Sequence, residues 1–207
     1  PEDIQLIQND TKTCPDTGMA GASRSLYMDG NATIIAANKL LAAMRKEDGT
    51  LRTYDEMKAE GIETKYLGRY ETNTTPGLCR LDPNTGIGDP TPAFTYCLNL
   101  AEVEVDTKTG KTTVLKFTCV DFVGRIGNID AVNGQAYSGI MHGIGFALKE
   151  DYADVKKHAN MFGAGTSYIK DVPDDINLIH IDGAISDGPF GSSGASEAFQ
   201  ASGHCAV

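Results

Sequence analysis

Residues 100–121 read LAEVEVDTKTGKTTVLKFTCVD, and this stretch decides the fold. Its first arm alternates apolar with acidic residues: Ala101, Val103 and Val105 against Glu102, Glu104 and Asp106. Its second arm is rich in β-branched residues, and a turn containing Gly110 joins the two arms. Because successive side chains of a strand point to opposite faces, the pattern predicts a β-hairpin with one buried face.

Helices are expected on both sides of this hairpin. From Ser25 to about Met44, apolar residues recur at helical spacing, which predicts a helix. Thr53 and Glu56 match a capping box, in which each residue caps the other's backbone N–H. They predict a short helix that ends at Gly61.

The segment GQAYSGIMHGIGFALKEDY (134–152) predicts a helix studded with glycines. Each glycine inside a helix costs about 1 kcal/mol relative to alanine. Four of them therefore indicate close approach of a neighbouring backbone or of a ligand, and tight helix–sheet packing explains them equally well: Gly134, Gly139, Gly143 and Gly145.

Short strands are expected at 4–7 and 176–181, and a last helix follows the Gly/Ser-rich stretch near the end of the chain. The order helix, hairpin, helix, strand, helix predicts an α+β fold, a mixed sheet with β-hairpins covered by helices. We expect one domain over 1–207, or two lobes of about 1–95 and 96–207. Residues 70–93 predict a long loop, and such loops are usually functional or disordered.

The composition is acidic, with 18 Lys and Arg against 28 Asp and Glu and a net charge of −10. Such a surface repels nucleic acid and anionic membranes. No apolar run approaches the roughly 20 residues that cross a bilayer, and residues 1–10 lack the features of a signal peptide. We therefore expect a cytoplasmic protein with no nucleic-acid or membrane partner.

The cysteines and histidines show no spacing typical of a metal site. The five cysteines are scattered without any C-x-x-C pair, which argues against an iron–sulfur cluster or zinc site within this chain. Reduced thiols agree with a cytoplasmic location. Among the histidines, His142 in the glycine-rich segment is the one expected to face a ligand.

Two loops rich in glycine and serine each precede a predicted helix: GMAGASRS (18–25) and GPFGSSGASE (188–197). The free N–H groups of a first helical turn, together with serine hydroxyls, bind anions such as phosphate. Arg24 would add charge-assisted hydrogen bonds. Neither loop is a nucleoside-triphosphate or ordinary dinucleotide motif, and simple helix capping remains the alternative.

Glu197 lies near the start of the last predicted helix, where the helix dipole stabilises a carboxylate. Packed against a cofactor, the same carboxylate could act as a general base. By itself, a glutamate near the start of a helix is more often an ordinary surface residue.

Three separated blocks resemble the molybdenum hydroxylases of the xanthine oxidase family: CPDTGMAGASRSLYMDGNA (14–32), DFVGRIGNIDAVNGQAYSGIMHGIGFAL (121–148) and GPFGSSGASEAF (188–199). Their order and spacing extend the resemblance over essentially the whole chain. Within the family, the chain is most similar to the flavin-free aldehyde oxidoreductases of sulfate-reducing bacteria. Ser196-Glu197-Ala198 replaces the Gly-Glu-Pro found in most of the family.

The resemblance implies a molybdopterin cofactor in its cytosine dinucleotide form, with the molybdenum held by the pterin and by no protein side chain. Glu197 would stand beside the metal as the catalytic base. The implied cofactor contacts are Ala22, Ser23, Arg24 and Ser25 with the pterin or its phosphates, Gln135 with the pterin, and Ala195 through its backbone.

The activity implied is the oxidation of small aldehydes to carboxylic acids, with electrons leaving through [2Fe-2S] clusters outside this chain. The chain would be the C-terminal molybdopterin-binding part of a large subunit, inactive alone. It would need the rest of the subunit or partner chains, carrying the iron–sulfur domains and the other half of the molybdenum domain, and the full enzyme would be a homodimer. Two alternatives stay open: a purine or other heterocycle hydroxylase of the same family, and a non-catalytic domain for cofactor binding or assembly.

Overall fold

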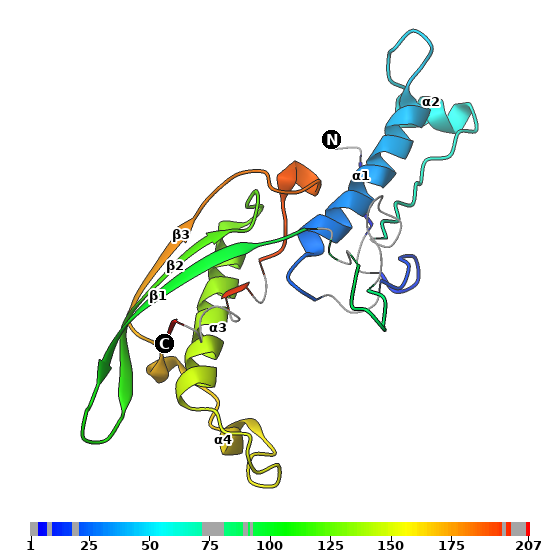
Figure 1. The fold of residues 1–207 in the computed structure, drawn as a ribbon. Coiled ribbons are helices and arrows are strands. Elements are labelled where there is room, and N and C mark those ends of the chain that lie inside the picture. The colour runs from blue at the N-terminus through cyan, green and yellow to red at the C-terminus, as the bar shows by residue number, and fades with distance from the viewer. Residues whose placement is uncertain are drawn as a thin grey trace.

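The computed structural model describes residues 4–7, 10–17, 21–71, 81–88, 91, 93–195, 198–199 and 206–207. Figure 1 shows two groups of elements, with two helices on one side and a sheet with its covering helix on the other. The elements are α1 (Ser25–Met44), α2 (Tyr54–Ala59), β1 (Tyr96–Val105), β2 (Thr112–Phe122), α3 (Ile129–Leu148), α4 (Met161–Ala164) and β3 (Asp175–His180), with 3₁₀ turns at Ile169–Asp171 and Pro189–Gly191.

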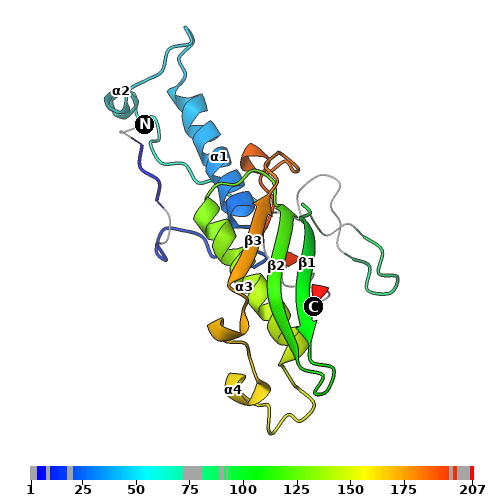
Figure 2. The same ribbon diagram turned by 90° about the vertical axis from the view of Figure 1, so that its left-hand side faces the viewer.

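The three strands form one mixed sheet in the order β1-β2-β3 (Figure 2). β1 and β2 are antiparallel, with Tyr96 opposite Phe122, and β3 runs parallel to β2, with His180 opposite Asp121. The predicted hairpin, the strand near 176–181 and the α+β class are therefore confirmed.

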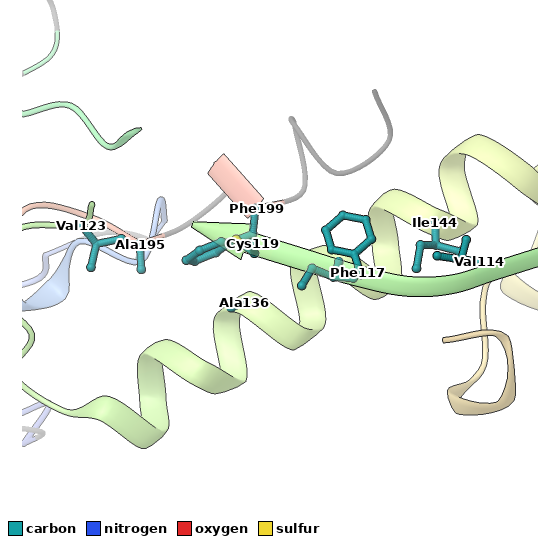
Figure 3. Packing of buried hydrophobic residues seen from close by; sticks show 9 residues of the cluster. Val114, Phe117, Cys119, Val123, Ala136, Ile144, Ala195 and Phe199 are labelled. Atoms are coloured by element: carbon teal, nitrogen blue, oxygen red, sulfur yellow. The ribbon is translucent and has the colours of Figure 1, made fainter. Parts of the chain in front are cut away.

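The core lies between the sheet and α3. Phe117 and Cys119 on β2, and Ile140 on α3, are fully buried. Phe199 joins them from the C-terminal part of the chain, and the labelled side chains form a row along β2 (Figure 3). Burial of this apolar surface is the main force that holds α3 on the sheet.

The capping box is confirmed at the start of α2. The Thr53 hydroxyl accepts a hydrogen bond from the Glu56 N–H, and the Glu56 carboxylate accepts one from the Thr53 N–H. The helix ends at Ala59, close to the predicted stop at Gly61.

Two local expectations differ from the structure. Residues 4–7 form no strand. Val103 and Val105 are 40% and 49% exposed, because β1 shifts register between Glu102 and Val103 and the hairpin continues beyond the part of β2 that β3 pairs. On α1, Leu26, Ile34 and Leu41 are exposed, and Tyr27 is the one buried residue of that helix.

The glycine-rich helix is confirmed, although α3 begins at Ile129, ahead of the predicted start. Asn128 caps it by accepting a hydrogen bond from the Ala131 N–H at 3.1 Å. Most of the last predicted helix, including Glu197, lies outside the described residues. Among the helices that are described, none combines the length and the hydropathy needed to traverse a bilayer.

Candidate functional site

The two Gly/Ser-rich loops meet although they are far apart in the sequence. A Cβ atom placed on Gly194 would lie only 2.8 Å from the backbone oxygen of Ala22, so glycine is required for this approach. The N-terminal part of α1 also packs against the 3₁₀ turn at Pro189–Gly191 (Figure 1). There a Cβ on Gly30 would lie 2.5 Å from a side-chain carbon of Pro189.

The segment just before β1 joins the same place. The Ser193 hydroxyl donates to the Phe94 backbone oxygen at 2.8 Å, and the Thr95 hydroxyl donates to the Gly194 backbone oxygen. The Ser193 N–H donates to the Val123 oxygen at the end of β2 at 3.0 Å. The residues just before β1 and just after β2 thus position the loop at 191–195.

The loop before α1 has an unusual backbone. Ala22 and Ser23 adopt positive φ angles of 61° and 43°, a region that costs energy for residues with a side chain. Such strain often marks a binding site, because the surrounding structure must enforce it. The Ser23 hydroxyl donates to Oε1 of Gln135 on α3, which links this loop to the glycine-rich helix.

A pocket of about 220 Å³ opens where these segments meet. Its polar lining comes from Arg24, Tyr27, Thr91, Thr95 and Ser193, and no carboxylate lines it among the residues that the structure describes. The N-cap residue of α1, Arg24, makes no side-chain capping hydrogen bond to the first turn of the helix. A guanidinium, several hydroxyls and a helix start are the groups that bind phosphate, so this donor set fits a phosphate-bearing cofactor.

Tyr27 ties the start of α1 to the loop at 187–191. Its hydroxyl donates to Oδ1 of Asp187 at 2.6 Å and lies 3.1 Å from the Tyr70 hydroxyl. Burial, reinforced by these two neighbours, raises the pKa of Tyr27 far above its usual value. Tyr27 therefore stays neutral and serves as a fixed wall of the pocket.

The structure brings together most of the predicted site residues. Ala22 and Arg24 line the pocket, and Ser23 contacts Gln135. Ser25 is the exposed first residue of α1, and Ala195 is 8% exposed and packs in the hydrophobic core. Glu197 lies outside the described residues.

Sequence reasoning did not name several lining residues, among them Tyr27, Thr91, Thr95 and Ser193. Ser193 stands inside a loop that the sequence singled out. Thr91 belongs to the long loop at 70–93, whose length alone was the signal. A second and larger hollow, of about 470 Å³, lies along α1 and contains none of the predicted site residues.

A mixed sheet with a helix on one face, beside a cationic pocket built from Gly/Ser loops, defines a candidate domain for an anionic organic cofactor. Residues 1–173 match the family model of the molybdopterin cofactor-binding domain. The chain belongs to this family, and with it to the xanthine oxidase family of molybdenum hydroxylases.

Solved structures and curated relatives agree with this assignment. The chain is 41% identical to the aldehyde oxidoreductase of Megalodesulfovibrio gigas over its full length. It superposes on the crystal structure of the aldehyde oxidoreductase from Desulfovibrio desulfuricans ATCC 27774 with a TM-score of 0.86 and 44% identity, over 99% of this chain. It is also 28% identical to a probable hypoxanthine oxidase of Escherichia coli strain K12, over 95% of this chain.

In each of these three comparisons the chain spans 22% of the length of the relative. The relatives thus contain much that this sequence does not.

Proposed function

We propose that this chain forms the molybdopterin-binding part of an aldehyde-oxidising molybdenum hydroxylase. The observation that carries the proposal is the meeting of three distant segments at one pocket, with Arg24 in its wall and the Ser23–Gln135 contact beside it. Identity of 41% to an aldehyde oxidoreductase over the whole chain supports the choice of substrate class.

Each predicted residue has a distinct role in this proposal. Arg24 and the hydroxyls of the pocket hold the phosphates of a cytosine dinucleotide form of the cofactor. Gln135 hydrogen-bonds the pterin, with Ser23 holding its side chain, and Ala195 contributes a backbone contact. When bound, the cofactor supplies the molybdenum that accepts two electrons from the substrate.

Glu197 is the general base in this proposal, and it removes a proton as the aldehyde is oxidised to the acid. The electrons leave through [2Fe-2S] clusters outside this chain. These clusters, and the other half of the molybdenum domain, belong to the rest of the large subunit or to partner chains. We place the assembled enzyme in the cytoplasm as a homodimer, and we regard residues 1–207 as one domain or as two lobes that divide near residue 95.

Elemental analysis and substrate assays of the full enzyme test the proposal. We expect molybdenum and iron in the purified enzyme, together with turnover of benzaldehyde. Pure enzyme that lacks both molybdenum and pterin would instead support a domain that serves assembly alone.

Purine hydroxylation is the second candidate, and the 28% identity to a probable hypoxanthine oxidase motivates it. Steady-state assays with benzaldehyde and with hypoxanthine on the same preparation separate the two. A kcat/KM that is higher for hypoxanthine than for benzaldehyde would favour the second candidate.

A further inference from the structure

A buried polar array connects β2, β3 and α3 on the covered face of the sheet. Nδ1 of His180 lies 2.6 Å from Oδ2 of Asp121, and Nε2 of the same ring lies 2.7 Å from Oδ1 of Asn133. The Asp121 side chain is fully buried and that of His180 is 11% exposed. The imidazole therefore links the C-terminal ends of β2 and β3 to the N-terminal part of α3.

Burial of this polar array costs free energy. Desolvation raises the pKa of the Asp121 carboxyl, and the charge and hydrogen bond of His180 oppose that rise only in part. Oδ1 of Asp121 has no hydrogen-bond partner among the described residues. Buried polar groups are costly unless they are paired, so separation of His180 from Asp121 or from Asn133 would add to this cost.

The array acts on the half of α3 that buries the smaller apolar side chains. The large buried side chains of α3, Ile140 and Ile144, lie in its second half. Its first half contributes the small, fully buried Ala136 and the partly buried Val132 to the core. Apolar burial has little directional preference, whereas hydrogen bonds fix distance and angle. Asn133 thus supplies the directional restraint at this end.

Gln135 lies two residues beyond Asn133, about 200° further around the helix, and so on the opposite side of α3. There it meets Ser23. A rotation or slide of the first turns of α3 would consequently move Gln135 relative to the loop at 21–25. Because that loop has a strained backbone at Ala22 and Ser23, it is poorly suited to hold the helix by itself.

We propose that Asp121, His180 and Asn133 are positioning residues, which fix the first turns of α3 so that Gln135 is presented to the cofactor. The inference rests on the proposed function, since it takes Gln135 to be a cofactor contact. These three residues do not line the pocket, so the inference gives a role to residues outside it.

The test compares variants of the full enzyme in two measurements, the rate at which molybdenum is lost after gel filtration and the thermal unfolding temperature. Asn133→Ala breaks the helix end of the array and leaves the Asp121–His180 pair intact. We expect it to accelerate cofactor loss roughly tenfold or more, the range seen when a supporting hydrogen-bond partner of a metal site is removed. Asn133→Asp keeps an oxygen acceptor for Nε2 and should restore slow loss.

Ile144→Val is the matched control, because it weakens packing at the far end of α3 without touching the array. It should lower the unfolding temperature and leave the rate of cofactor loss unchanged. If Asn133→Ala and Ile144→Val accelerate loss equally at equal destabilisation, the array is merely structural and the inference is overturned.

Gln135→Ala distinguishes failure of the positioning role from failure of the cofactor contact at Gln135. Rapid cofactor loss in Gln135→Ala, combined with normal retention in Asn133→Ala, overturns the positioning role and leaves the proposed function standing. Normal retention in Gln135→Ala overturns the positioning role and removes Gln135 from the cofactor contacts, whereas the proposed function is decided by the molybdenum content of the unaltered enzyme. Rapid loss in both variants, with rescue by Asn133→Asp, supports the inference.

Discussion

Among single residues, Arg24 tests how the cofactor is held, because it is the cationic side chain among the described residues of the pocket. Arg24→Ala removes hydrogen bonds to a charged group, which contribute about 1.5–3 kcal/mol. We therefore expect cofactor loss from the full enzyme to be about 10- to 100-fold faster. Molybdenum content followed over time measures this rate. Arg69→Ala, at a residue whose side chain is 68% exposed, should leave the rate unchanged.

Glu197 tests the chemical step apart from binding. Glu197→Gln keeps the size and hydrogen bonding of the side chain but removes the base. We expect kcat for aldehyde oxidation to fall at least about 100-fold, with the molybdenum content unchanged. Glu104→Gln, on the exposed part of β1, is the control and should keep full activity. An active Glu197→Gln enzyme would remove this residue from the mechanism.

Local sequence patterns predict a role for Arg24 but not for the buried array of Asp121, His180 and Asn133. Arg24 stands in a loop whose composition already indicates an anion site. The buried array has no such signal, because His180 is 59 residues from Asp121 and 47 from Asn133. Only the pairing of β3 with β2 and the docking of α3 bring them together. The expectation that His142 faces a ligand stays a prediction.

Among the elements, α2 provides a test by pH. The hydrogen bond from Lys46, followed by that from the Thr53 N–H, lowers the pKa of Glu56 from 4.5 to about 2. A lowered pKa means that the carboxylate stabilises the fold above pH 4.5, and that this stabilisation is lost as the pH falls from 4.5 through about 2. Glu56→Gln should therefore destabilise α2 at pH 6 and make little difference near pH 2.

Amide hydrogen exchange over Tyr54–Ala59 measures this effect locally. Thr53→Ala is the comparison, because it removes the neutral half of the same capping box. Its cost of about 1 kcal/mol should not depend on pH. If Glu56→Gln and Thr53→Ala show the same pH profile, the lowered pKa of Glu56 is not the cause.

The glycines of α3 are not equivalent. A Cβ on Gly134 would meet nothing within 4 Å, whereas one on Gly145 would lie 2.4 Å from the Ser167 hydroxyl oxygen. In cofactor-free enzyme, we expect Gly134→Ala to raise the free energy of unfolding by up to about 1 kcal/mol. Gly145→Ala should lower it by about 1–3 kcal/mol, because the new methyl group overpacks a buried site. Urea unfolding of both variants checks the opposite signs.

The elements that the sequence predicts best are those whose pattern is complete within a short window. The hairpin has alternating residues and its own turn, and the capping box needs only Thr53 and Glu56. The parallel pairing of β3 with β2 depends on a connection through α3, so no local pattern contains it. The helical spacing around α1 likewise predicts the helix but not what it packs against, and Leu26 and Ile34 are 40% and 44% exposed.

On the scale of the whole molecule, the candidate site differs in charge from the rest of the chain. The chain carries a net charge of −10, yet the described lining of the pocket contains Arg24 and no carboxylate. An acidic surface would disfavour an anionic ligand in general, so this local reversal of sign concentrates such a ligand at one place. Arg24 supplies the positive charge, and the other described lining residues are neutral.

Because the pocket lies where three distant segments of the chain meet, its ligand should fasten them to one another. A ligand that binds only the folded state stabilises the parts it touches. Removal of the cofactor from the full enzyme should therefore increase amide hydrogen exchange at 21–25, 93–95 and 188–195. Exchange within Thr112–Phe122, the central strand of the sheet, should change little, because its hydrogen bonds do not involve the pocket. A uniform increase over all these segments would mean that the cofactor stabilises the fold as a whole, and that the pocket is not its specific point of attachment.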